Sequence, residues 1–284
     1  MCLGRQMPEL PEVETIARGL RSSLEGRTIR AVTVDWPRTV AQPPLDEFRE
    51  RIAGRRVESV GRRGKFVVIG LDGGCLLIHL KMSGRLRVVP AGEPVEDHTH
   101  TIFHLDGDWE LRFQDVRKFG RVHLVEKPVQ VTAALGPEPL DHDFTLDHFR
   151  ALLVRRTGRL KSLLMNQEFL AGLGNIYADE ALHAARLHPL RTADSLSPDE
   201  QAHLYHSIRR VLGRAVADRG TTLDDGGYQD AEGRAGAYQE ELAVYRRTGE
   251  PCHSCGTLIQ RTVIGGRSSH FCPTCQPQQL EGEA

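Results

Sequence analysis

Residues 66–80 read Phe-Val-Val-Ile-Gly-Leu-Asp-Gly-Gly-Cys-Leu-Leu-Ile-His-Leu, and they are the most informative stretch in the first half of the chain. Two short β-rich runs, Phe66–Leu71 and Cys75–Leu80, flank the turn sequence Asp72-Gly-Gly74. This pattern is typical of two strands joined by a turn. The turn sequence also divides the apolar residues into two short runs, which excludes a membrane span here, because a span needs about 18 consecutive apolar residues.

The same pattern continues over residues 27–126. Six further β-rich runs lie between Gly and Pro residues: Thr28–Trp36, Arg56–Val60, Leu86–Val89, His98–Leu105, Trp109–Phe113 and Gly120–Val125. Eight strands at this spacing, with no helical pattern between most of them, indicate an antiparallel β-sandwich or barrel. A helix is expected ahead of them over residues 11–25, because Pro11 suits a first helical position and Gly26 can end the helix.

The second half of the chain has helical periodicity. It follows the segment Leu135-Gly-Pro-Glu-Pro-Leu140, whose prolines indicate a linker. We expect helices at Leu146–Arg155, Leu160–Asn166, Ile176–Ala185 and Pro198–Asp218. The turn Gly172-Leu-Gly174-Asn175 leads into the third helix; its backbone N–H groups could bind an anion, or the turn could serve ordinary helix packing. Residues 219–240, rich in Gly and Asp, are expected to form a long mobile loop.

The composition is that of a folded protein of about two domains, with 284 residues, 39% of them hydrophobic and 26% charged. The net charge of −1 gives no reason by itself to expect a nucleic-acid partner. Basic residues nevertheless collect in three blocks, at 51–65, 150–161 and 209–219. Such blocks can build one basic face that binds a phosphate backbone, or they can be separate solvated patches.

The first six residues carry one charge and no apolar segment. A secretory signal or lipid anchor is therefore not expected, and the sequence predicts a cytoplasmic protein.

Four of the six cysteines have the spacing of a zinc site. Cys252 and Cys255 are separated by two residues, as are Cys272 and Cys275, and sixteen residues lie between the pairs. Such a small unit has almost no core, so metal binding would supply its folding energy. The alternative, two disulfides, needs an oxidising compartment that the sequence does not indicate. The other two cysteines, Cys2 and Cys75, are expected to be inert thiols.

The sequence Met7-Pro-Glu-Leu-Pro-Glu-Val-Glu14 has a possible catalytic use. A Met followed by Pro is normally trimmed, so translation from Met7 would leave Pro8 with a free secondary amine. Such an amine can attack an aldehyde-like carbon and form a Schiff base, with Glu9 in reach for proton transfer. The alternative is a Pro-rich lead into the first helix.

Seven motifs, in order, resemble those of the formamidopyrimidine-DNA glycosylases, the bacterial 8-oxoguanine DNA glycosylase and abasic-site lyase family. They are Met7–Glu14, Gly61-Arg-Arg-Gly-Lys65, His79-Leu-Lys-Met-Ser-Gly84, Asp115-Val-Arg-Lys-Phe-Gly120, Leu135–Leu140, Gly172-Leu-Gly-Asn-Ile-Tyr-Ala-Asp-Glu180 and the four-cysteine unit. The resemblance covers residues 7 to about 277. It implies an α+β multidomain protein: an antiparallel β-sandwich with a leading helix, a helix–two-turn–helix domain and a β-hairpin zinc finger.

The implied division of the chain follows these motifs. Its parts are a leader at 1–7 that the mature protein lacks, a catalytic domain at 8–134, a linker at 135–145, a helical domain with its lesion-capping loop at 146–240, a zinc finger at 241–277 and a tail at 278–284.

The resemblance also implies roles for single residues. Pro8 resembles the nucleophile that attacks C1′ of the damaged nucleotide, Glu9 the acid/base that assists sugar opening, and Glu12 a carboxylate lining the lesion pocket. Lys65 resembles a lysine that contacts phosphate and helps β-elimination, and Arg267 an arginine tied to phosphate binding and δ-elimination.

Six more residues resemble positions of the family that contact DNA. Met82, Arg117 and Phe119 match side chains that enter the duplex where the lesion leaves, although the two apolar ones could instead be core residues. His98, Arg156 and Asn175 match other DNA contacts. The chain departs from the family at Lys81 and Arg246, which are often Gly, and at Lys118, which is often Arg.

The implied activity is a bifunctional glycosylase and lyase. It would excise oxidised purines, 8-oxoguanine and formamidopyrimidines, from double-stranded DNA and cleave the abasic strand by β,δ-elimination, as a monomer with one structural zinc ion. One alternative is the sister activity on oxidised pyrimidines, although Leu10 and Val13 look more like the purine branch. The other is a non-catalytic zinc protein that binds damaged DNA, which follows if the leader stays attached, because Pro8 would then be a tertiary amide.

Overall fold

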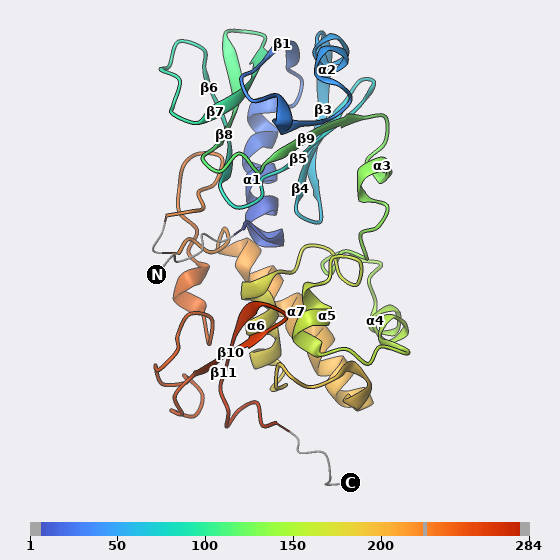
Figure 1. The fold of residues 1–284 in the computed structure, drawn as a ribbon, viewed down its shortest axis with the longest axis vertical. Helices are drawn as coiled ribbons and strands as arrows, with labels where there is room; N and C mark the ends of the chain where they lie inside the picture. Colours follow the sequence, from blue (N-terminus) through green and yellow to red (C-terminus); the bar gives the residue numbers. More distant parts are fainter. Residues whose placement is uncertain (1–6, 224–225, 279–284) are drawn as a thin grey trace. The chain divides into compact units, whose positions relative to one another are not determined.

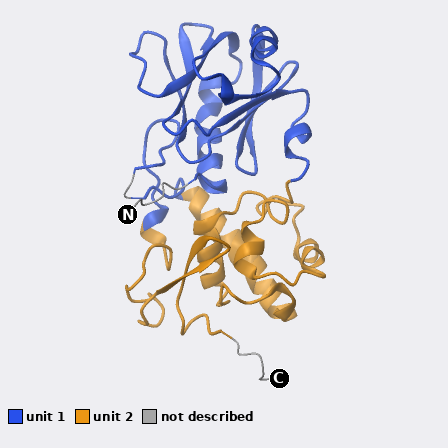
Figure 2. Cartoon of the chain, in the orientation of Figure 1, with its two compact units in different colours: residues 1–134, 218–239 blue, residues 135–217, 240–284 orange. Residues whose placement is uncertain are grey.

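The computed structural model describes residues 7–223 and 226–278. The first six residues of the expected leader, Cys2 among them, and the last six residues of the chain lie outside that part. The chain divides into two compact units (Figure 2). The first comprises residues 1–134 and 218–239, and the second residues 135–217 and 240–284. The sequence grouped loop 219–240 with the helices, whereas here 218–239 packs with the β-rich unit.

The first unit begins with helix α1, Leu10–Leu24, one residue from its expected position. Pro11 lies in its first turn, and the N–H of Glu9 donates to Glu12 Oε2 at 2.8 Å, which satisfies a backbone donor at the helix start. Its apolar side, which includes Ile16 and Leu20, is buried. The helix ends before Gly26, whose φ of +87° suits glycine.

All eight expected strands of the first unit are present. They are β1 (Thr28–Val34), β3 (Arg55–Arg63), β4 (Phe66–Leu71), β5 (Gly74–His79), β6 (Gly84–Pro90), β7 (Thr99–Leu105), β8 (Trp109–Asp115) and β9 (Arg121–Val125). The hairpin at 66–80 pairs Leu71 with Gly74, as its turn sequence predicts. The sequence missed strand β2 (Val40–Gln42), helix α2 (Leu45–Ile52) and helix α3 (Val129–Thr132).

The nine strands follow one hydrogen-bonded order, β2-β9-β5-β4-β3-β1-β7-β8-β6. Neighbours are antiparallel except β2 and β9. Strands β1 and β3 pair only at Thr28↔Arg56 and Ile29↔Arg55, so this short contact joins two groups of strands. Figure 1 shows α1 running alongside both groups, and one core cluster contains Leu20 of α1, Ile69 of β4 and Phe103 of β7. The expected α+β architecture with a large antiparallel β domain is thus confirmed.

The second unit contains the four expected helices, each within two residues of its predicted ends. They are α4 (Leu146–Leu153), α5 (Leu160–Met165), α6 (Asn175–Ala184) and α7 (Pro198–Ala217). The expected zinc-finger hairpin consists of β10 (Gln260–Ile264) and β11 (Arg267–Phe271) (Figure 1). Its turn residues, Gly265 and Gly266, have φ values of +57° and +74°, which explains why both are glycines. None of the helices in the described part of the chain has the length and apolar character needed to cross a bilayer.

Candidate functional site

The N-terminal catalytic candidates of the first unit gather around the carboxylate of Glu12. Pro8, Glu9 and Glu12 are all buried, and Glu12 has no exposed surface. Its Oε2 accepts the N–H of Glu9, and its Oε1 accepts the N–H of Thr221 at 2.8 Å. Charge-assisted hydrogen bonds of this kind are among the stronger ones in proteins. Glu12 therefore fixes the backbone beside Pro8 and the first part of loop 219–240 to the same side chain.

Two residues of the loop fit closely against α1. Gly220 has a φ of +79°, and a Cβ there would lie 2.7 Å from Glu12 Oε1, so no other residue fits without a shift. The buried Tyr228 hydroxyl donates to the carbonyl of Arg219 at 3.0 Å. Burial and the neighbouring Glu12 raise the pKa of Tyr228 well above its ordinary value, so the hydroxyl stays a donor. The sequence did not single out Gly220, Thr221 or Tyr228, because their roles depend on a contact about 200 residues distant along the chain.

Lys65 lies in the turn before β4 and is 6% exposed, which excludes a solvated strand end. Its charge acts on His79, a motif residue to which the sequence assigned no role. Burial, followed by the positive charges of Lys81 and Lys65, lowers the pKa of His79 to about 3. The N–H of Lys81 donates to His79 Nδ1 at 3.0 Å, so the neutral ring carries its proton on Nε2.

Met82, Arg117 and Phe119 form a cluster. Arg117 Nη1 lies 3.1 Å from Met82 Sδ, and the guanidinium carbon lies 4.9 Å from the centroid of the Phe119 ring. Phe119 is 47% exposed, so it is not a core residue. The structure thus joins Arg117 and its near neighbour Phe119 to Met82, which lies 35 residues before Arg117 in the sequence.

Asp115 organises the loop that presents this cluster. Its buried carboxylate accepts the Ser83 hydroxyl and the N–H groups of Arg117 and Gly120. The backbone of Asp115 also pairs with His98, whose side chain is exposed: the His98 carbonyl accepts the N–H of Asp115 at 2.9 Å. The sequence missed the roles of Ser83 and Asp115, although both lie in motifs quoted above.

In the second unit, Asn175 is the first residue of α6, and its Nδ2 donates to Ser268 Oγ at 3.3 Å. Its Oδ1 is buried without a hydrogen-bond partner among the described residues. Arg267, next to Ser268, is exposed beside the hairpin turn, and Arg156 is exposed in the loop between α4 and α5. Asn175 is therefore hydrogen-bonded to the strand that carries Arg267, whereas Arg156 lies in a different loop, between α4 and α5.

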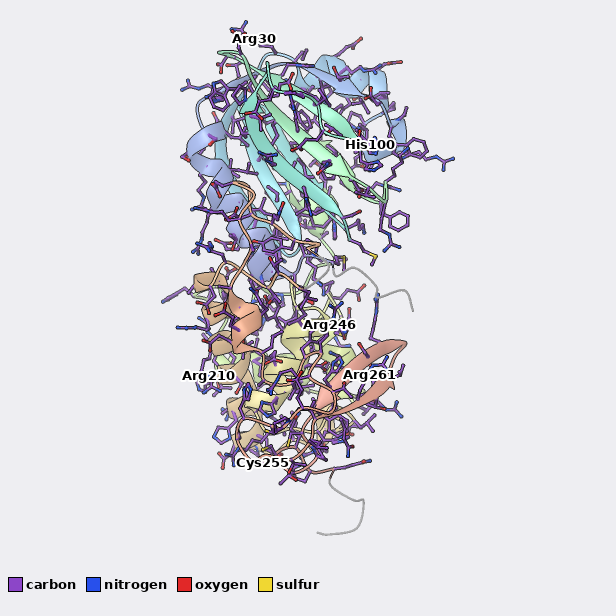
Figure 3. The ribbon with its side chains drawn as sticks, turned by 90° about the vertical axis from the view of Figure 1, so that its left-hand side faces the viewer. Arg30, His100, Arg210, Arg246, Cys255 and Arg261 are labelled. Carbon is purple, nitrogen blue, oxygen red and sulfur yellow. The ribbon has the colours of Figure 1, made fainter. Side chains whose placement is uncertain are left out.

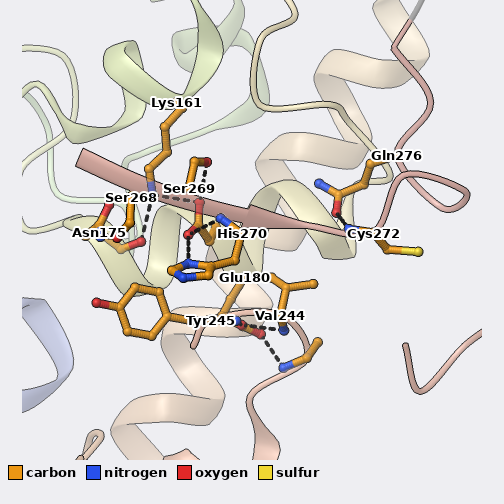
Figure 4. Close-up of polar contacts among 12 residues, drawn as sticks. Lys161, Asn175, Glu180, Val244, Tyr245, Ser268, Ser269, His270, Cys272 and Gln276 are labelled. Carbon is orange, nitrogen blue, oxygen red and sulfur yellow. Dashed lines mark hydrogen bonds and ion pairs between the residues drawn. The ribbon is translucent and has the colours of Figure 1, made fainter. Parts of the chain in front are cut away.

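Glu180 of α6 attaches the segment that leads into the zinc finger. Its fully buried carboxylate accepts the N–H groups of Ala243, Val244 and Tyr245 at 2.8–3.0 Å (Figure 4). Burial raises the pKa of Glu180 despite these donors. The signal in the sequence was the adjacent pair Asp179 and Glu180, the two acidic residues of α6.

The four zinc-spaced cysteines converge. Their Sγ atoms all lie within 4.8 Å of one another, with 3.9 Å between Cys252 and Cys275 and 3.5 Å between Cys255 and Cys272. Zinc–sulfur bonds of about 2.3 Å in a tetrahedron put neighbouring sulfurs about 3.8 Å apart, so the site fits zinc. Four thiolates leave no open position on the ion, which makes the zinc structural. Cys75, by contrast, is buried in the first unit, and burial raises the pKa of its thiol.

The three departures from the family pattern share one backbone property. Lys81, Lys118 and Arg246 have φ values of +54°, +58° and +61°, in the left-handed region that favours glycine. Figure 3 labels Arg246 and Cys255, both in the second unit. Glycine at two of these positions in the family thus has a conformational reason, and this chain places charged side chains there instead.

Three family models match the chain in succession. They are the formamidopyrimidine-DNA glycosylase N-terminal domain over residues 7–122, the H2TH domain of the same enzymes over 135–225, and the zinc finger found in FPG and IleRS over 249–278. The formamidopyrimidine-DNA glycosylases of Herpetosiphon aurantiacus and Desulforamulus reducens are 48% and 49% identical to this chain. Each alignment covers 95% of this chain, with 100% and 99% of the relative.

Solved structures give the same result. A Lactococcus lactis FPG variant in complex with Fapy-dG containing DNA superposes with a TM-score of 0.89 at 35% identity, over 95% of this chain and 100% of that one. MutM (FPG) from Thermus thermophilus superposes with a TM-score of 0.85 at 42% identity, over 96% and 100%. The chain therefore belongs to the formamidopyrimidine-DNA glycosylase family.

Proposed function

We propose that this protein is a base-excision repair enzyme, a bifunctional DNA glycosylase and abasic-site lyase that removes oxidised purines from double-stranded DNA. The observation that carries the proposal is the buried Pro8–Glu9 backbone held by Glu12 at the start of α1, within a domain of this family. Relatives solved with Fapy-dG and with abasic-site DNA support the same substrate class.

The proposed reaction begins at the nitrogen of Pro8. Its lone pair attacks C1′ of the damaged nucleotide, the glycosidic bond breaks, and the oxidised base leaves with the bonding electron pair and takes up a proton. Glu9 assists sugar opening by proton transfer, which gives an iminium between Pro8 and C1′. Loss of the 3′ phosphate by β-elimination and of the 5′ phosphate by δ-elimination follows, with Lys65 and Arg267 at the phosphates.

This chemistry requires a free amine at Pro8. If Met7 stayed attached, the nitrogen would be a tertiary amide without a nucleophilic lone pair. We therefore propose that the active form lacks residues 1–7. The N-terminal family model, whose match starts at Met7, supports this division.

Extrusion of the base would depend on the Met82, Arg117 and Phe119 cluster. An exposed aromatic ring under a guanidinium can take the place of a base that has left the stack, which offsets an unstacking cost of a few kcal/mol. His98, Arg156 and Asn175 would contact the DNA. Rotating the Asn175 amide by 180° keeps its contact with Ser268, whose hydroxyl then donates, and puts amide N–H donors where Oδ1, which has no partner among the described residues, now lies.

We also propose that the enzyme acts as a monomer. A repair enzyme acts where chromosomal DNA lies, so we place it in the cytoplasm, at the nucleoid.

Borohydride trapping on protein begun at Met7 tests the function. An active amine gives a covalent adduct with 8-oxoguanine DNA, and Pro8→Gly, which keeps an amine but loses the ring, should impair trapping while retaining binding. Absence of any adduct from wild-type protein would favour the non-catalytic alternative. Preference for thymine glycol over 8-oxoguanine would favour the pyrimidine branch.

A further inference from the structure

The second unit contains a fully buried ion pair that the proposed mechanism does not use. Lys161 of α5 and Asp179 of α6 have no exposed side-chain surface, and Lys161 Nζ lies 2.8 Å from Asp179 Oδ1 (Figure 4). Lys161 Nζ also donates to the carbonyl of Asn175 at 2.7 Å. The pair therefore holds the first residue of α6, which is one of the proposed DNA contacts.

The other hydrogen bonds of Asp179 go to strand β11. Its Oδ1 accepts the Ser269 hydroxyl at 2.9 Å, and its Oδ2 accepts the N–H and Nδ1–H of His270 at 2.9 and 3.0 Å. With Lys161, four donors converge on one carboxylate. Three of these donors belong to Ser269 and His270. Asp179 is therefore hydrogen-bonded to the hairpin beginning two residues after Arg267, the proposed δ-elimination residue.

The turn of the same hairpin lies against α5. A Cβ on Gly265 would lie 3.3 Å from Ser162 Oγ, and Ser162 follows Lys161 in the sequence. Ser268 Oγ in turn accepts Asn175 Nδ2 at 3.3 Å. Hydrogen bonds to Asn175 and Asp179 therefore hold β11 on the C-terminal side of Arg267, and the turn on its other side comes close to α5.

Such a pair is poorly explained by stability alone, because replacing a buried ion pair with well-packed apolar side chains is often neutral or stabilising. Its four-donor geometry instead specifies where β11 lies relative to the start of α6. We propose that Asp179, held by Lys161, is a positioning residue that fixes Arg267 relative to Asn175, and that Ser269 and His270 transmit this position to the hairpin. The inference rests on the proposed role of Arg267 in δ-elimination.

The test uses abasic-site DNA and protein with Pro8 at its N-terminus, and it measures the ratio of δ- to β-elimination product. The double variant Ser269→Ala, His270→Phe removes two hairpin donors but leaves the ion pair and an aromatic ring. A second double variant, Lys161→Met with Asp179→Leu, replaces the pair by apolar side chains. Val263→Ala, at an exposed residue of β10, is the matched control, and Arg267→Ala tests the underlying role.

We expect both double variants to lower the product ratio by about tenfold to a hundredfold, since a displacement of about 1 Å in a catalytic group can cost about a hundredfold in rate. Zinc content and the rate of borohydride trapping should stay as in Val263→Ala. Unchanged product ratios in both double variants, with a lowered ratio in Arg267→Ala, would overturn the positioning role and leave the proposed function intact. An unchanged ratio in Arg267→Ala would remove the role of Arg267 and the inference with it. Loss of zinc from both double variants would also overturn the inference, because the contacts would then hold the finger together rather than position Arg267.

Discussion

Glu12 is a single side chain that fixes two distant backbone segments, next to Glu9 and at Thr221. The sequence alone shows that Glu12 lies four residues after Pro8, and it suggests the chemistry of a proline amine. The contact between Glu12 and Thr221 could not be predicted, because a pattern of residues does not show which distant loop packs against the start of a helix. The same limit applies to Lys161, which stands in a basic block that suggests surface but is fully buried beside Asp179.

The pH dependence of stability should report on His79. Its pKa is lowered to about 3 in the fold against about 6.5 when unfolded, so the unfolded chain binds a proton first as the pH falls. Stability from this group is therefore present above pH 6.5 and lost toward pH 3, by at most about 1.4 kcal/mol per pH unit. His79→Asn keeps an acceptor for the Lys81 N–H and does not titrate.

Urea unfolding at pH 7 and pH 5 checks this. The advantage of wild type over His79→Asn should shrink by about 1–2 kcal/mol between the two pH values. Parallel pH profiles for the two proteins would contradict the buried, neutral ring.

Arg246→Gly should stabilise the protein. Arg246 has a φ of +61°, a conformation that costs about 1–2 kcal/mol for a residue with a Cβ, while glycine costs about 0.5–1 kcal/mol in backbone entropy. The expected net gain is about 0.5–1 kcal/mol. Arg246→Ala, which removes the charge but keeps the Cβ, is the control in thermal melts; an equal gain in both variants would assign the effect to charge.

Among the helices and strands, regular elements with strong local signals were the predictable ones. The eight expected strands and the five expected helices, α1 and α4 to α7, all lie close to their predicted bounds. Strand β2 has three residues, too few to show an alternation, and α2 has only Phe48 and Ile52 as buried anchors among charged side chains. Both depend on packing against the sheet, which local sequence does not reveal.

The loop between β8 and β9 should be needed for base extrusion. Phe119→Ala removes the exposed ring that packs against Arg117, and loss of one stacked aromatic is worth about 1–3 kcal/mol, or roughly 10–100-fold. Single-turnover excision from duplex DNA should fall by this factor, with a smaller effect on a single-stranded substrate. Val116→Ala, also exposed in this loop, is the matched control. Equal losses on both substrates would argue against a wedge.

Considered as an entire chain, the protein combines a near-neutral net charge with a nucleic-acid function. The net charge therefore did not indicate a nucleic-acid partner, and the three basic blocks were compatible both with a DNA-binding face and with separate solvated patches. The zinc site, by contrast, was predictable in full, because its four ligands come as two close pairs. The role of Arg267 could be inferred only from the resemblance to the family, since an exposed arginine beside a turn has no distinctive sequence spacing.

Removing the metal should affect the two units differently. Cys255→Ser leaves three thiolates, and because the finger has only a small core around Val244 and Ile259, it should unfold. Binding to abasic-site DNA should then weaken, while the β-rich unit, which has its own core, keeps its structure. Zinc analysis with circular dichroism and a binding titration checks this; full affinity in zinc-free protein would contradict a structural role for the metal.

The proposed reaction depends on a bond between the Pro8 nitrogen and the C1′ of the opened sugar. Mass spectrometry of the borohydride-trapped and digested adduct locates that bond. We expect the reduced sugar on a peptide whose first residue is Pro8. An adduct on Lys65 or another lysine, or an active protein whose Pro8 is still joined to residues 1–7, would contradict it.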